Sequence, residues 1–220
     1  MPTPRVLYLH GFSSSPQSKK AVVFRDHLAP RGLAVHAVDL RVPALETLRV
    51  SSMIDAAAAA IDAGSPRPER ERAIVIGSSL GGLTAAKLAE RDARVCALVL
   101  LAPAFGFGAR WRARLGAAAV DEWRRTGWYA MGGDDPDAPP RLDIGFLDDA
   151  LAVEAAGPVD VRVPTLVVHG TKDDAVPIAS SRAWAKGKPH VRVVELDDGH
   201  QLYGTLDRIC VELDRFLFGA

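Results

Sequence analysis

Residues 73–86 read AIVIGSSLGGLTAA, and this stretch decides the fold. An apolar run typical of a buried strand ends in a cluster of glycine and serine, and small residues typical of a helix follow. Residues 77–81, GSSLG, match the pattern G-x-S-x-G with Ser79 at its centre. In this pattern a serine lies on a sharp strand-to-helix turn, and glycine suits the positions two before and two after it because they are forced close together.

Two serines stand side by side in this turn, and the flanking residues distinguish them. If the pattern is centred on Ser78, its flanks become Ile76 and Leu80, whose side chains are too bulky for the close approach. We therefore predict that Ser79 is the nucleophile and that Ser78 packs under the turn.

Other uses of a glycine-rich turn fit less well. Residues 77–82 have the glycine spacing of a phosphate-binding loop, but Leu83 stands where that loop needs a lysine. A dinucleotide fingerprint needs glycine at position 79. From the pentapeptide alone, a turn without any chemistry remains open.

Two later segments offer the residues that a serine nucleophile requires. Residues 169–177, HGTKDDAVP, follow an expected strand and offer Asp173 or Asp174. Residues 197–200, DDGH, follow the last expected strand and offer His200. Turn aspartates are usually turn formers and a loop histidine is usually surface, but serine, acid and histidine at strand ends in this order form an α/β-hydrolase triad.

The acid is predicted to be Asp173. It lies three residues after Gly170 and three before Val176, which matches the usual phasing of this loop. Its neighbour Asp174 is expected to point the other way and to help the turn.

An oxyanion hole needs one N–H from the residue after the nucleophile and one from the loop after the first strand. The first is Leu80, and the second loop contains His10-Gly11-Phe12. We predict Phe12 as the second donor. His10 is expected to hold this loop by hydrogen bonds and not to act as the base.

Strand-like and helix-like stretches alternate along the chain, which implies parallel crossovers and a doubly wound α/β sheet. We expect strands at residues 5–11, 33–40, 72–78, 95–104, 163–170 and 191–197. Helices are expected from Ser15-Pro16 to Pro30, around 45–63, from 81 onward and over 201–218. The 220 residues are enough for one α/β domain over 1–220.

Residues 105–158 interrupt this alternation and are expected to form an inserted cap or lid. A helix is predicted over 109–126 and a short one over 146–155. The aromatic residues of the insertion either line an acyl pocket or only hold the lid to the core; they are Trp111, Trp123, Trp128 and Tyr129.

The same insertion carries charged residues with two interpretations each. The arginines either meet an anionic group such as a CoA phosphate or form a solvated helix face; they are Arg110, Arg112, Arg114, Arg124 and Arg125. Residues 133–137, GDDPD, lack the ligand spacing of a calcium loop, and we interpret them as a surface turn.

The overall composition excludes several classes of protein. Lys plus Arg and Asp plus Glu both number 27, so the chain lacks the basic excess of a nucleic-acid binder. The longest apolar run, residues 95–104, is too short to span a bilayer. Cys96 and Cys210 fit no metal or redox spacing and are expected to be free buried thiols, which suggests a cytoplasmic protein. The sequence leaves the oligomeric state open.

Residues 8–21, YLHGFSSSPQSKKA, together with residues 77–82, GSSLGG, resemble the small bacterial YqiA-like esterases. Nearly the whole chain resembles the α/β-hydrolase superfamily, and residues 169–177 are similar to a stretch of acyl-protein thioesterases. The resemblance implies an α/β-hydrolase fold and hydrolysis of a small-molecule carboxylic ester or thioester by the three triad residues. The insertion departs from the YqiA-like pattern, so it leaves the substrate undetermined.

This chemistry needs no metal and no organic cofactor, because a serine nucleophile, a histidine base and an orienting aspartate supply it. A protein of this fold that only binds a partner is the alternative. Such a protein would be expected to lack a triad member, and the sequence retains all three.

Overall fold

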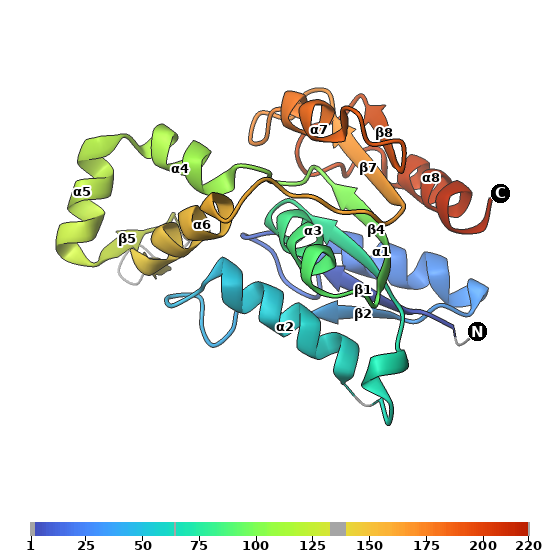
Figure 1. Ribbon diagram of the computed structural model, residues 1–220. Coiled ribbons are helices and arrows are strands. Elements are labelled where there is room, and N and C mark those ends of the chain that lie inside the picture. Colours follow the sequence, from blue (N-terminus) through green and yellow to red (C-terminus); the bar gives the residue numbers. More distant parts are fainter. Residues whose placement is uncertain (1–2, 64, 133–139, 220) are drawn as a thin grey trace.

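The computed structural model describes residues 3–63, 65–132 and 140–219. A six-stranded sheet in the order β2-β1-β3-β4-β7-β8 forms its centre, and every neighbouring pair is parallel (Figure 1). Its strands are β1 Arg5–Leu9, β2 Val35–Val38, β3 Ala73–Ser78, β4 Val95–Leu101, β7 Thr165–Gly170 and β8 Val191–Leu196. The predicted doubly wound sheet and its six strands are confirmed.

Helices cover both faces of this sheet. On β1, alternate side chains point to opposite faces, so that Leu7 and Leu9 join one apolar cluster and Val6 and Tyr8 join the other. The first cluster includes α2 Val50–Asp62 and α3 Leu80–Arg91, and the second includes α1 Lys19–Leu28 and α8 Leu206–Phe218. Helix α7 Ile178–Ala185 connects β7 to β8, and 3-10 turns lie at Ala29–Arg31 and Pro68–Arg70.

The first helix begins later than the sequence predicts. Its N-cap is Ser18, whose hydroxyl accepts a hydrogen bond from the Ala21 N–H at 3.4 Å, and not Ser15. Ser15 instead accepts a hydrogen bond from the Gln17 N–H in the preceding turn. A serine followed by proline favours a helix start, but a serine three residues later gives an equally good cap.

The insertion between β4 and β7 lies beyond the carboxyl ends of the strands (Figure 1). Its elements are α4 Phe107–Leu115, α5 Ala117–Thr126, β5 Trp128–Ala130, β6 Arg141–Asp143 and α6 Gly145–Ala155. The single helix predicted over 109–126 is wrong, because Gly116 adopts a φ of 79° and divides it. The antiparallel pair of β5 and β6 was not predicted. Residues 133–137, interpreted as a turn, lie outside the described residues.

Polar contacts fix the insertion to the rest of the molecule. The Arg49 guanidinium at the start of α2 donates to the Asp143 carboxylate at 3.0 Å. The N–H and hydroxyl of Ser51 donate to Asp149 on α6 at 2.9 and 2.6 Å. Because these residues are about 100 positions apart in sequence, the contacts tie β6 and α6 to the start of α2 and set where the insertion sits over the sheet.

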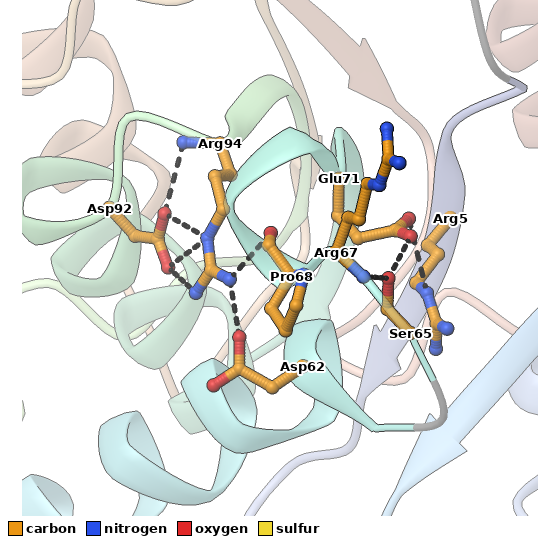
Figure 2. Close-up of polar contacts among 8 residues, drawn as sticks. All are labelled: Arg5, Asp62, Ser65, Arg67, Pro68, Glu71, Asp92 and Arg94. Carbon is orange, nitrogen blue, oxygen red and sulfur yellow. Dashed lines mark hydrogen bonds and ion pairs between the residues drawn. The ribbon is translucent and has the colours of Figure 1, made fainter.

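The amino ends of the strands are joined by a network around Arg94, shown in Figure 2. This guanidinium contacts Asp92 at 2.6 Å, the carbonyl oxygen of Pro68 at 3.1 Å, and Asp62 at the end of α2. The hydrogen bonds that its guanidinium donates, first to Asp92 and then to Asp62, raise the pKa of Arg94. The same view shows a second group of contacts. Glu71 accepts hydrogen bonds from Arg5, the first residue of β1, and from the Ser65 hydroxyl. Structural ion pairs therefore occupy one edge of the sheet, and the opposite, carboxyl edge is where α/β sheets place ligands.

Candidate active site

Ser79 occupies a strained turn between β3 and α3. Its φ of 54° and ψ of −118° are sparsely populated by residues with side chains. The backbone is held there because its N–H donates to Leu101 O at 2.8 Å and its carbonyl accepts from Ala104 N–H at 3.0 Å. A Cβ on Gly77 would lie 2.3 Å from Gly81 O, so the turn requires glycine at the predicted position. The surrounding strand ends thus maintain the strain and hold Ser79 at the sheet edge.

The two predicted partners of Ser79 converge on it from the loops after β7 and β8. His200 Nε2 lies 2.9 Å from Ser79 Oγ, and His200 Nδ1 lies 2.7 Å from Asp173 Oδ2. These loops contact each other closely, since a Cβ on Gly170 would lie 2.3 Å from Asp198 O. The serine hydroxyl can therefore donate to the imidazole, which in turn donates to the carboxylate.

The Asp173 carboxylate is fully buried and has four hydrogen-bond donors around it. One oxygen accepts from the N–H groups of Ala175 and Val176 at 2.9 and 2.8 Å. The other lies within reach of His200 and, at 3.1 Å, of His169 Nε2. Burial alone raises the pKa of Asp173, but hydrogen bonds from the two histidines and from Val176 outweigh burial and hold it well below its usual range. The group is a carboxylate at any ordinary pH.

His169 is a residue of this site that sequence reasoning did not assign. It is fully buried near the end of β7, and its Nε2 lies 2.9 Å from Val176 O as well as 3.1 Å from Asp173. Both partners are acceptors, so Nε2 carries a proton, and Nδ1 lies 2.8 Å from Ser181 Oγ. The signal for it was present, because this histidine begins the HGTKDDAVP segment. Asp174, by contrast, is exposed at the wall of the neighbouring cavity.

The loop after β1 lies directly against Ser79. A Cβ on Gly11 would be 3.3 Å from Ser79 Cβ, so this loop is close enough to present a backbone N–H to an oxyanion. His10 holds the loop as predicted: its Nε2 accepts from Leu40 N–H at 3.2 Å, and its Nδ1 donates to Gly11 O at 2.8 Å. Burial lowers the pKa of His10, which keeps this hydrogen-bonded imidazole neutral. Leu80 begins α3, where the first N–H groups have no partner within the helix.

A cavity of about 770 Å³ opens above Ser79 and His200. Four aromatic side chains line it, which are Phe12, Phe107, Trp111 and Tyr203. Its charged lining residues are Lys20, Arg110, Arg114 and Asp174. A volume of this size fits a small organic substrate.

Only Trp111 of the four aromatic residues proposed for an acyl pocket lines this cavity. Trp123 is buried behind it, with its indole N–H donating to Leu142 O at 3.0 Å and its ring centroid 5.4 Å from that of Trp111. Tyr129 packs against Trp123, with 5.0 Å between ring centroids. Trp128 is exposed beneath the Arg141 guanidinium. The expectation that Trp123, Trp128 and Tyr129 form the wall is therefore corrected, because Gly116 turns α5 away from α4 and places its aromatic face behind the wall.

Phe107 was missed, although its spacing of four residues from Trp111 puts both on one face of α4. Phe12 stacks on Phe146 of the insertion, with ring centroids 5.2 Å apart, and so ties the loop beside Ser79 to α6.

The five arginines of the insertion divide between the two interpretations. Arg124 and Arg125 are exposed and pair with Asp148 and Glu122, as a solvated helix face predicts. Arg112 is also exposed and does not line the cavity. Arg110 and Arg114 do line it.

Other sequence expectations concern membranes, metals and cysteines. Among the described residues, no helix has the length and apolarity needed to cross a membrane. Within that same part of the chain, no three His, Cys, Asp or Glu side chains gather as metal ligands would. Both cysteines are free, and Cys210 is buried as expected, whereas Cys96 is only half-buried.

A family model for the uncharacterised protein family UPF0227 matches residues 5–211. The chain belongs to this family. The match, together with the fold, confirms the resemblance to the YqiA-like proteins and to the α/β-hydrolase superfamily. The search of curated proteins finds no match to this UPF0227 member.

Solved structures with the same fold cover nearly the whole chain. A protein from Agrobacterium vitis S4 has a TM-score of 0.82 at 24% identity, over 97% of this chain and 88% of its own. Mouse α/β-hydrolase domain-containing protein 10 has a TM-score of 0.78 at 22% identity, over 97% and 89%. Est1E from Butyrivibrio proteoclasticus has a TM-score of 0.71 at 22% identity, over 98% and 87%. At these identities the similarity establishes the α/β-hydrolase fold of this UPF0227 protein.

Proposed function

We propose that this UPF0227 protein is a serine hydrolase that cleaves carboxylic esters or thioesters through an acyl-enzyme intermediate. The observation that carries the proposal is the position of His200 between Ser79 Oγ, at 2.9 Å, and the buried carboxylate of Asp173, at 2.7 Å. A strained nucleophile at a strand end, a base within hydrogen-bond reach and a group that orients the base are what covalent acyl transfer needs.

The first half-reaction acylates the serine. Ser79 Oγ attacks the carbonyl carbon of the substrate while His200 Nε2 takes the hydroxyl proton, and Asp173 stabilises the imidazolium that forms. The N–H groups of Phe12 and Leu80 are assigned to the oxyanion of the tetrahedral intermediate. His200 then gives its proton to the departing alcohol or thiol.

Water completes the cycle. It attacks the acyl carbon of the ester on Ser79 while His200 takes one of its protons, and the carboxylic acid leaves as the serine regains a proton. The side chains of this chain supply every proton transfer, so the proposed reaction uses neither a metal nor an organic cofactor. The insertion is assigned the role of a cap over the acyl group, since Phe107 and Trp111 line the cavity from α4.

Labelling with a fluorophosphonate tests the proposal against the alternative of a binding protein with a hydrolase fold. We expect a covalent adduct whose mass spectrum places it on Ser79, and p-nitrophenyl ester hydrolysis that Ser79→Ala reduces by up to ~10⁶-fold. The matched control is Ser78→Ala, a buried neighbour that is expected to keep most of the activity. No adduct and no hydrolysis would support the binding protein, and an adduct on Ser78 would overturn the choice of nucleophile.

A further inference from the structure

The cavity above Ser79 is more basic than the protein as a whole. The chain has equal numbers of basic and acidic residues, yet three cationic side chains and one carboxylate line the cavity. That carboxylate, Asp174, is exposed at the edge. The charge of the nearby Asp173 favours the charged forms of Lys20 and Arg110, but its side chain is fully buried and its oxygens are occupied by four donors, so it makes no direct ion pair with either cation.

Arg110 is a half-buried cation of this cavity without a direct partner among the described residues. Its guanidinium is half-buried on the cavity-facing side of α4, and it makes no hydrogen bond or ion pair with any residue that the structure describes. The nearest acid on α6, Glu154, uses its two oxygens on the N–H groups of Gly108 and Ala109, at 2.6 and 3.1 Å. Burial lowers the pKa of Arg110, which reflects the free-energy cost of a partly desolvated charge.

Arg124 and Arg125 of the same insertion, by contrast, have carboxylate partners. Arg124 makes two hydrogen bonds to Asp148, at 3.0 and 2.7 Å, although it is exposed to solvent. A planar guanidinium with five donors fits a carboxylate or phosphate in this two-point manner. Arg110 has the same donors free to face a cavity that contains the proposed nucleophile.

Lys20 on α1 adds a second positive charge to the cavity, next to the His200 loop. It is only 4% exposed, and its ammonium donates to Gln201 O at 3.0 Å. An ammonium has three donors, so this contact leaves capacity for a ligand. Burial lowers the pKa of Lys20 to about 8, so the group is mainly charged at neutral pH.

We propose that the substrate of this site carries an anionic oxygen group, a carboxylate or a phosphate, and that Arg110 binds this group with support from Lys20. The inference rests on the proposed esterase function and adds the chemical class of its substrate. The anionic group can belong to the acyl part or to the leaving group, and the experiment separates these two sources.

The test compares matched pairs of esters that differ in charge. For the acyl side, the pair is the p-nitrophenyl half-ester of adipic or suberic acid, with its distal carboxylate free or methylated. For the leaving group, the pair is butyryl-CoA and the uncharged butyryl-N-acetylcysteamine. We expect kcat/KM to favour the anionic member of at least one pair by about 10- to 100-fold, the range for a hydrogen bond to a charged group.

Variants on one helix connect this preference to Arg110. Arg110→Gln is expected to reduce the anionic-to-neutral ratio of kcat/KM to near one, and Arg110→Lys, which keeps the charge, to retain part of it. Arg112→Gln is the matched control, because Arg112 lies two residues away, is exposed and does not line the cavity, so ratio and activity should stay unchanged.

A measurement on the unaltered protein avoids any folding defect of the variants. Free adipate or suberate is expected to inhibit hydrolysis of p-nitrophenyl butyrate competitively, and the uncharged diamide is not. Ser79-dependent hydrolysis with equal rates within both pairs and no inhibition by the dianions overturns the anionic substrate and leaves the esterase function standing. Absence of hydrolysis and of fluorophosphonate labelling overturns both.

Discussion

Asp173 keeps a negative charge inside the protein because donors from three directions converge on it. The loop backbone supplies two N–H groups, and His169 and His200 supply one ring N–H each. The same contacts fix the carboxylate plane, so His200 is oriented by a group that cannot itself rotate. His169 thus helps to hold the carboxylate that we propose as the acid, and it does not contact the proposed nucleophile itself.

Exchange of this carboxylate for an amide tests its assignment as the acid. Asp173→Asn should lower kcat by ~10⁴-fold, by analogy with the triad aspartate of known serine hydrolases, because an amide NH2 facing His200 favours the wrong imidazole tautomer. The matched change one position along, Asp174→Asn, should cost less than about tenfold, because Asp174 is exposed. Steady-state kinetics with p-nitrophenyl butyrate measure both.

The opposite ranking of these two variants would mean that the acid is one position later than we assign. Near-normal rates in both would place the acid elsewhere, and Asp197 or Asp149 would then be tested.

At the scale of elements, the insertion is held by two kinds of contact. Polar contacts of β6 and α6 with the start of α2 fix its position, and a set of aromatic rings fills the space between α4, α5, β5 and the loop after β1. Phe12 belongs to this set, so the loop assigned to the oxyanion hole and the cap share one packing unit. A change in the packing of the cap is therefore transmitted to the loop beside Ser79.

Removal of the Trp123 side chain tests whether this residue stabilises the insertion or lines the cavity above Ser79. It is 1% exposed and packs among rings of α4 and β5, so Trp123→Ala should lower the free energy of unfolding by about 3–5 kcal/mol. Urea unfolding followed by circular dichroism measures this loss. Trp128→Ala is the control, since this exposed side chain should cost less than about 1 kcal/mol.

A change in acyl-chain preference is instead expected from Trp111→Ala, whose ring faces the cavity. If Trp123→Ala leaves stability intact and alters chain preference, then Trp123 contacts the substrate and the packing role is wrong.

At the scale of the whole molecule, carboxylates that are partly or fully buried connect stability to pH. Burial raises the pKa values of Asp173, Asp198 and Glu212, but hydrogen bonds and nearby charges outweigh burial and lower all three. Glu212 is only 2% exposed and pairs with Arg192, Arg208 and Arg215. A carboxyl group whose folded pKa is depressed stabilises the fold fully above its unfolded pKa, and this contribution is lost as pH falls through the folded pKa.

Thermal unfolding should therefore become easier on the acid side. We expect the Tm to be nearly constant between about pH 5 and 7 and to fall progressively below about pH 4, the unfolded range of carboxyl groups. Asp173→Asn removes one of these groups and should make the decline shallower. A Tm that stays constant down to about pH 2 would show that these carboxylates do not gain stability from their partners.

The sequence by itself determined the sheet, the turn at Ser79 and the order of the three residues at the strand ends. These features depend on local rules: buried parallel strands are apolar runs, and a sharp strand-to-helix turn needs glycine at 77 and 81. The carboxyl ends of parallel strands share one edge, so the order of residues along the chain was enough to bring Ser79, Asp173 and His200 together.

Only the tertiary structure decided which side chains face the cavity. The aromatic spacing in the insertion continues across Gly116, so periodicity could not reveal that the helix divides there and that Trp123 lies behind Trp111. The five arginines of the insertion look alike in sequence, yet their surroundings differ. Arg124 on α5 forms an ion pair with Asp148 on α6, whereas Arg110 lines the cavity. Contacts between residues far apart in the chain depend on how whole elements pack, and no local pattern in the sequence encodes that packing.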